Sequence, residues 1–329
     1  DYKYYCQVRE NTATCFTATN AVQIKDDVSI WSGSAWSNGA PTLTKKAIIN
    51  NDYNTTLHGV FECCSLVVNA TKTLTVSDGD YVTIDYSIIN NGVIVIENNG
   101  SIIQIDENSN NTGEVSITRI AQARQYDYIY WSSPVQDFPI NSIPNSHRYE
   151  WDTTILNPKG TQGNWINPST TTMTKGKGYI VRASNSAVSA QDLPVVFTGT
   201  PFNGMFNFPI KRGSILLSAN DNYNLIGNPY PSAIDVGEFL FQNADPSGPN
   251  PVIEGAVHIW SHGTLPAAIA SPFYQNFTYN YNSNDYIVYN STGPISGTGT
   301  FLGKIASGQG FFVKMNDGAA DDSKFVTFK

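Results

Sequence analysis

Two histidines have the spacing of a metal-binding pair. His258 and His262 are four residues apart, so on a helix both rings could bind one metal ion. The surrounding residues 256–260 (AVHIW) are instead typical of a β-strand. On a strand the two side chains share a face but lie roughly 13 Å apart, which is too far for one ion. We therefore predict ordinary surface histidines and no metal site.

Two short glycine-containing segments resemble phosphate-binding loops. Residues 176–178 read Gly-Lys-Gly and residues 308–310 read Gly-Gln-Gly. Each is followed by a β-type run, Tyr-Ile-Val or Phe-Phe-Val, and not by a helix whose N-terminus would bind the anion. We predict that both are tight turns before core strands.

Two acidic loops carry the oxygen ligands that calcium prefers. They are residues 106–113 (DENSNNTG) and 317–322 (DGAADD). Neither has the ordered alternation and terminal bidentate Glu of a dedicated site. We expect solvated turns and no cofactor, with a structural calcium ion as the alternative. The other acidic residues are scattered through turns, so the sequence offers no carboxylate pair of the glycosidase type and predicts no catalytic residue and no enzyme.

Aromatic residues make up 12% of the chain, and sugar rings stack on such side chains. Trp31, Trp36 and Trp165 lie in polar, loop-like surroundings, which makes them weak candidates for glycan stacking. Trp151 and Trp260 occupy matching positions in an internal repeat, which favours core positions for both. The sequence also offers a Tyr-rich contact surface, FYQNFTYNY, specific to the second half of that repeat.

All four cysteines fall within the first 64 residues: Cys6, Cys15, Cys63 and Cys64. In a chain of secreted composition they are disulfide candidates, and four cysteines allow three pairings. A bridge between the adjacent Cys63 and Cys64 would be strained. A zinc site is the alternative, but His58 is the only nearby histidine and the second pair lacks Cys-x-x-Cys spacing.

The composition limits the partners of the chain. A net charge of −8, from 19 Lys and Arg against 27 Asp and Glu, provides no basic footprint for nucleic acid. No apolar run approaches the ~18 residues that cross a membrane, and no leader is evident, so we expect a soluble, processed chain without membrane insertion. Charged residues are only 14% of the total, while Asn, Ser, Thr, Gly and Tyr are plentiful, which favours β-structure over helices.

Short strands alternate with turns between residues 44 and 120. Such strands form either a meandering sandwich or a solenoid whose stacked coils bury ladders of Val, Ile and Leu. The similar consecutive rungs 92–100 and 100–106 favour the solenoid. We predict an all-β chain with a Cys-containing segment at residues 1–27 and a short, parallel β-helix-like β-solenoid at residues 28–120. Examples of the strands are residues 65–68 (SLVV), 81–84 (YVTI) and 93–96 (VIVI).

Residues 121–329 contain an internal duplication. Three segments recur in the same order, and only the loops between them differ in length. This order predicts two homologous halves, about residues 121–200 and 215–329, which pair across a pseudo-twofold axis as one duplicated β-sandwich. The matching segments are residues 128–134 (YIYWSSP) with 223–229 (YNLIGNP), Trp151 with Trp260, and residues 175–182 (KGKGYIVR) with 307–314 (SGQGFFVK).

Five longer phrases follow one another along the chain from about residue 28 to the end. They are residues 31–41 (WSGSAWSNGAP), 94–101 (IVIENNGS), 127–135 (DYIYWSSPV), 224–232 (NLIGNPYPS) and 306–313 (ASGQGFFV). Their order resembles a region of large cell-surface proteins that Flavobacterium-type Bacteroidota export by type IX secretion. The resemblance carries over no catalytic residue. Asp152-Thr153-Thr154 resembles the sequence that these bacteria O-glycosylate, which implies a glycan on Thr153.

The resemblance implies an extracellular or outer cell-surface location, with other domains of a larger surface protein as partners. We therefore expect a non-enzymatic structural or adhesin module, related to attachment or gliding motility. Glycans or surface polysaccharide are the expected ligands of such a module. The alternative is a carbohydrate-binding accessory region of a secreted polysaccharide-degrading enzyme.

Overall fold

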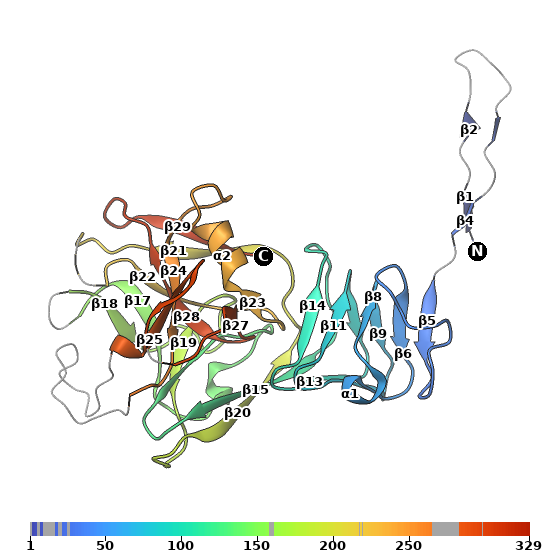
Figure 1. The fold of residues 1–329 in the computed structure, drawn as a ribbon, viewed down its shortest axis with the longest axis horizontal. Helices are drawn as coiled ribbons and strands as arrows, with labels where there is room; N and C mark the ends of the chain where they lie inside the picture. The colour runs from blue at the N-terminus through green and yellow to red at the C-terminus, as the bar shows by residue number, and fades with distance from the viewer. Residues whose placement is uncertain are drawn as a thin grey trace.

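The computed structural model describes residues 2–4, 7–8, 17–18, 22–24, 27–157, 161–216, 218, 220–264, 283–297 and 299–329. The chain is nearly all β, as predicted: a β-solenoid lies beside a larger body of antiparallel sheets (Figure 1). A pair of short antiparallel ribbons precedes the solenoid at its far end, and only the backbone of these strands is described. They are β1 (Tyr2–Tyr4) with β4 (Val22–Ile24), and β2 (Gln7–Val8) with β3 (Thr17–Ala18).

The solenoid has three parallel sheets between residues 28 and 123, all of which the structure describes. Inward and outward side chains alternate along each strand, and the parallel register stacks Leu74 on Ile94 and Val76 on Ile96. The strand order is β5 (Val28–Trp31), β6 (Lys46–Ile49), β9 (Leu66–Val68), β12 (Ile88–Asn90) in the first sheet; β7 (Tyr53–Asn54), β10 (Thr73–Val76), β13 (Val93–Ile96), β15 (Val115–Ala123) in the second; and β8 (Phe61–Cys63), β11 (Tyr81–Ile84), β14 (Ser101–Gln104) in the third.

The Asn-Gly corners explain why the coils can stack so closely. A Cβ at Gly92 would lie 2.3 Å from the carbonyl oxygen of Lys72 in the coil before it. Only glycine leaves room for that approach, so the turn residues that mark the sequence repeat also fix the spacing between coils. One corner holds the short helix α1 (Thr55–His58), capped by the side chain of Asn54.

The solenoid continues into the sandwich through one shared strand pair. β15 runs from Val115 to Ala123, across the expected boundary at residue 120, and pairs along its whole length with β20 (Gln191–Gly199). Phe197 of β20 is fully buried and packs against Phe138, with ring centroids 4.6 Å apart. A single buried core therefore extends from the coils into the first half of the sandwich.

The two halves of the sandwich share the order of their first four strands, as the predicted duplication requires, and the second sheet adds β26 at its edge. The strands that carry the three repeated segments occupy the same places in both sheets. The first sheet has the order β16 (Tyr128–Trp131), β19 (Tyr179–Arg182), β17 (Arg148–Leu156), β18 (Gln162–Ile166); the second has β22 (Tyr223–Gly227), β28 (Gly310–Met315), β24 (Ile253–Trp260), β25 (Tyr286–Asn290), β26 (Gly293–Ser296).

Backbone contacts between the halves follow a pseudo-twofold axis. Ser132 N donates to the Gly308 carbonyl at 2.7 Å, and the equivalent Gly227 N donates to the Gly176 carbonyl at 2.9 Å. Both acceptor glycines have positive φ, 68° and 77°, so the glycine segments are tight turns, as predicted. These turns lock each half to the strand end of the other.

The outer face of the second sheet is covered by α2 (Val236–Asn243) and by the pair β21 (Phe206–Lys211) and β29 (Ser323–Phe328). Asp235 caps α2 by accepting from Glu238 N at 3.0 Å. Phe239 of α2 packs edge-on against Phe311 of the sheet. The remaining elements are β23 (Ile234–Asp235) paired with β27 (Lys304–Ile305), and the 3-10 turns η1 (Ile140–Ser142) and η2 (Ser283–Asp285).

Candidate ligand-binding site

An aromatic layer fills the space between the two sheets of the sandwich. Its members come in equivalent pairs from the two halves: Trp165 lies opposite Trp151 across its own strand pair, as Tyr286 lies opposite Trp260. The layer has two ends related by the pseudo-twofold axis. It comprises Tyr128, Tyr130, Tyr149, Trp151, Trp165, Ile180, Tyr223, Leu225, Trp260, Tyr286 and Phe312.

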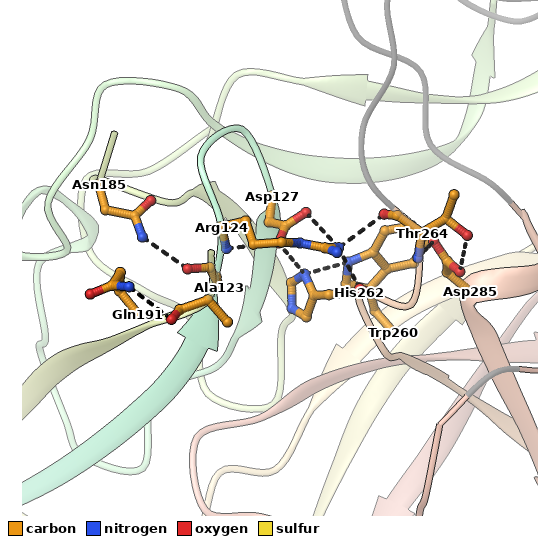
Figure 2. A network of polar contacts seen from close by, with 10 residues as sticks. Ala123, Arg124, Asp127, Asn185, Gln191, Trp260, His262, Thr264 and Asp285 are labelled. Atoms are coloured by element: carbon orange, nitrogen blue, oxygen red, sulfur yellow. Dashed lines mark hydrogen bonds and ion pairs between the residues drawn. The ribbon is translucent and has the colours of Figure 1, made fainter. Parts of the chain in front are cut away.

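At the first end, which we call the closed end, Arg124 joins the two halves (Figure 2). Its Nη2 donates to the carbonyl oxygens of His262 at 2.5 Å and Thr264 at 3.0 Å. Its Nε donates at 3.0 Å to Asp127, whose carboxylate is 1% exposed. Thr264 is held in turn by the buried Asp285, which accepts from its N and Oγ1 at 2.9 and 2.8 Å. The guanidinium therefore connects the two halves at this end.

His262 is a neutral part of this network. Trp260 Nε1 donates to His262 Nδ1 at 3.1 Å, so the ring proton lies on Nε2. Burial lowers the pKa of His262 to about 4, although the nearby Asp127 opposes that shift. Burial also lowers the pKa of His258 to about 4, helped by the charge of Lys314. The prediction of ordinary surface histidines is therefore wrong, because the side chains of both pack against the aromatic layer.

At the second end, the pocket end, the surface has a cavity of about 410 Å³. Its floor is the margin of the second sheet, where Tyr223, Glu254 and Lys314 lie on adjacent strands. Its wall is the turn that leads into β22. The lining residues are Arg212, Ser218, Asn220, Asp221, Asn222, Tyr223, Glu254, Lys314 and Asp317.

Two ion-pair groups set the electrostatics of this cavity. Arg212, 3% exposed, contacts Asp221 at 2.8 Å through Nη2 and Asp317 at 2.7 Å through Nη1. The Arg212 Nε is buried without a hydrogen-bond partner in the part of the chain that the structure describes. On the floor, Lys314 Nζ contacts Glu254 at 2.9 Å and lies 5.5 Å from the Tyr223 ring centroid.

The pKa values show how firmly these charges are held. Burial opposes the charge of Lys314, but the hydrogen bond and charge of Glu254 outweigh it and raise the Lys314 pKa. The hydrogen bond from Arg212 lowers the pKa of Asp317. Burial raises the pKa of the Tyr223 phenol, which therefore stays a neutral hydrogen-bonding group.

Backbone contacts identify the two ends as equivalent. The carbonyl of Asp127 accepts from Ala183 N at 2.7 Å, and the carbonyl of Asn222 accepts from Met315 N at 2.9 Å. Both donors directly follow the repeated glycine segments, so Asn222 takes the place of Asp127. Asp127 is thus ion-paired with Arg124 at the closed end, whereas the equivalent Asn222 lines the polar cavity at the pocket end.

The tryptophans predicted for glycan stacking do not form a platform. Trp31 is 5% exposed and donates through Nε1 to the Asp52 carbonyl, so its predicted exposure is wrong. Trp36 is half-buried and packs on Trp31, Tyr53 and Phe61 with centroids 5.4–5.5 Å apart. These rings plug the first coil, because a solenoid end exposes apolar side chains that no neighbouring coil covers.

Trp165 lies far from the other two, on β18 within the aromatic layer. Its ring packs against Trp151 and Phe312, with centroids 5.0 and 5.9 Å away, and it is half-buried. The loop-like surroundings that suggested exposure are a strand end in the structure. Trp151 and Trp260, expected from the duplication to be core positions, are half-buried members of the same layer.

Thr153 is a buried residue, which argues against the predicted O-glycosylation. The side chain is 4% exposed, and Oγ1 donates at 2.5 Å to the Tyr223 carbonyl of the other half. A glycan on that oxygen would break the contact between the halves. The adjacent Thr154 is exposed.

The disulfide candidates are only partly described. Cys63 and Cys64 are free thiols, with Cys63 buried in the solenoid core, where burial raises the pKa of its thiol. Cys6 and Cys15 lie outside the described residues, as does the Tyr-rich segment of the second half.

The acidic loops make local contacts. Asp106 accepts from Asn108 N at 2.8 Å, in the manner of a solvated turn, and Asp317 pairs with Arg212. Among the described residues, no group of three or more His, Cys, Asp and Glu side chains could hold a metal ion. No helix in the same part of the chain is long and apolar enough to span a membrane.

Residues 19–329 match a protein family described as "Domain of unknown function (DUF8693)". The chain belongs to this family. The match covers both the solenoid and the duplicated sandwich. No curated protein and no solved structure matches the chain.

Proposed function

We propose that the chain is a non-enzymatic structural and adhesive module of a larger protein, displayed on the outer surface of Flavobacterium-type Bacteroidota after type IX secretion. The observation that carries the proposal is the shared strand pair between β15 and β20, which makes solenoid and sandwich one rigid unit with a continuous core. A surface protein needs such rigidity to hold a binding face away from the cell.

The two ends of the unit support different roles. The solenoid is a stack of coils whose far end is closed by the aromatic plug around Trp36. The sandwich carries the polar cavity, and its strands β22 and β24 lie away from the coil that holds the plug (Figure 1). We infer that the coils act as a spacer and that the sandwich makes the contact.

Deleting the codons for residues 28–329 from the parent gene tests this role. We expect attachment of cells to surfaces or gliding to fall, while the rest of the parent protein is still exported, as judged by protease treatment of whole cells. Unchanged attachment and gliding with the shortened protein on the surface would contradict the adhesive role.

The alternative is a carbohydrate-binding accessory region of a secreted polysaccharide-degrading enzyme. The cavity at the pocket end supports both roles equally, because a saccharide site would serve either. The gene neighbourhood and the remaining domains of the parent protein separate the two: a linked hydrolase domain would favour the accessory role, and further adhesive repeats would favour the surface module.

A further inference from the structure

We propose that the pocket end of the sandwich is a binding site for a neutral saccharide, with Tyr223, Glu254 and Lys314 as its principal contacts and Arg212 holding its wall in place. This inference deepens the adhesive role proposed above, because it names the ligand class that the sandwich would recognise. The size of the cavity, about 410 Å³, suits one or two sugar rings.

The paired charges point to a neutral ligand. Each cation in the cavity already has an acidic partner: Arg212 has Asp221 and Asp317, and Lys314 has Glu254. An anionic ligand would compete with these carboxylates for Arg212 and Lys314, and displacement of Asp221, whose side chain is 7% exposed, would leave that carboxylate desolvated. Hydroxyl groups both donate and accept, so a polyol can bridge carboxylate and ammonium together without separating them.

The floor offers polar partners for sugar hydroxyl groups. Lys314 Nζ lies over the half-buried Tyr223 ring, 5.5 Å from its centroid, and the neutral phenol of Tyr223 can donate or accept. Asn222 uses its amide nitrogen to hold the Met315 carbonyl at 2.8 Å, which fixes the turn beside the floor. Arg212 is held by two carboxylates and by its burial, so the wall is preorganised for binding.

The two equivalent ends of the sandwich differ in their charged contacts. At the closed end the Arg124 guanidinium joins the two halves through hydrogen bonds to His262 and Thr264. At the pocket end Arg212 pairs with Asp221 and Asp317, both of the second half, and lies at the wall of the polar cavity.

Saturation-transfer NMR and calorimetry with a defined sugar panel test the proposal. The probes are glucose, galactose, mannose, N-acetylglucosamine and their disaccharides as neutral sugars, with glucuronic and sialic acid as charged ones. We expect at least one neutral sugar to bind saturably and more tightly than either charged sugar. Lys314→Met and Glu254→Gln should each weaken binding about tenfold, since each removes a hydrogen bond to a charged group.

Lys304→Met is the matched control, because it removes an exposed Lys–Asp pair outside the cavity. It should leave sugar affinity unchanged, and circular dichroism should show that all three variants are folded. Binding of no neutral sugar, tighter binding of the charged sugars, or equal affinity in wild type and both pocket variants would each overturn the site. If the pocket variants lose sugar binding but cells that carry them still attach, the saccharide site stands and adhesion relies on another surface. If no neutral sugar binds and deletion of residues 28–329 still abolishes attachment, the saccharide site is wrong and the adhesive role stands.

Discussion

At the residue scale, a single hydroxyl shows how the two halves depend on each other. Thr153 lies in the first half and donates to the Tyr223 carbonyl in the second, while the next residue, Thr154, points into solvent. Trp151 Nε1 donates to the same carbonyl at 2.9 Å. Thr153 and Thr154 therefore have the same side chain, but only that of Thr153 is buried between the halves.

We predict that Thr153→Val destabilises the protein by about 1 kcal/mol, because it removes one buried hydrogen bond while keeping side-chain volume. Thr154→Ala, the matched control, should change the free energy of unfolding by less than about 0.5 kcal/mol. Urea denaturation measures both. Mass spectrometry of the native protein should find Thr153 unmodified, and a glycan at this residue would refute the buried position.

Histidine titration gives a second prediction at this scale. The folded pKa of His258 and His262 is about 4, below the ordinary value of 6.5, so the unfolded chain binds protons first as the pH falls. Stability from these groups is complete above pH 6.5 and is lost between pH 6.5 and about 4. We expect the free energy of unfolding to fall across this window, with a smaller fall in His258→Gln. A flat or rising profile in the wild type would contradict the neutral, buried state of both rings.

Some of these residues could be predicted from sequence and some could not. Trp151 and Trp260 were identifiable as interior because the duplication places them at equivalent strand positions. The predicted exposure of Trp31 is wrong because the Ser, Gly and Asn residues around it form a surface loop, while the ring itself points into the coil. Arg212 and Lys314 gave no local signal, because their partners Asp317 and Glu254 lie 105 and 60 positions away along the chain.

At the element scale, the turns between the halves are the critical joints. A Cβ at Gly227 would lie 2.3 Å from the Cβ of Ser132 in the other half. Gly255 lies in β24 of the same sheet, and a Cβ there would meet nothing within 4 Å. A side chain at Gly227 would therefore collide with the other half, whereas the space around Gly255 would admit one.

We predict that Gly227→Ala costs about 1–3 kcal/mol through overpacking, because the halves must separate to admit the methyl group. Gly255→Ala should be neutral or stabilising by up to about 1 kcal/mol, since alanine restricts the unfolded chain. Thermal or urea unfolding of the two variants decides this. Equal stability of both would show that the halves do not meet closely at Ser132.

The sequence predicts the strands of the solenoid because their apolar residues alternate with period two between glycine corners. It predicts the order of the repeats because the aromatic segments recur. The pairing of β15 with β20 could not be predicted from the sequence. It joins residues about 80 positions apart and extends a solenoid sheet with a strand from the sandwich, which no local pattern encodes.

At the scale of the whole molecule, the continuous core implies that solenoid and sandwich are stabilised together. Phe197 sits where they meet, fully buried between Trp131 and Phe138. Phe325 of β29 is 53% exposed and serves as a matched phenylalanine away from this junction.

We predict that Phe197→Ala lowers the free energy of unfolding by about 3–5 kcal/mol, because it opens a cavity in the shared core. Amide hydrogen exchange should accelerate in β13 and β15 of the solenoid as well as in β16 and β19 of the sandwich. Phe325→Ala should cost less than about 1 kcal/mol. Faster exchange in the sandwich alone would show that the two parts are stabilised independently.

The most direct test of the account is to incubate the purified chain with the neutral saccharide that it binds best and to measure retention and product formation in one experiment. An adhesive module should retain the saccharide saturably, lose most retention in Lys314→Met, and return the sugar with its length and linkage unchanged on chromatography. Shortened products that form with the wild type and not with the variant would contradict a binding module and establish an enzyme.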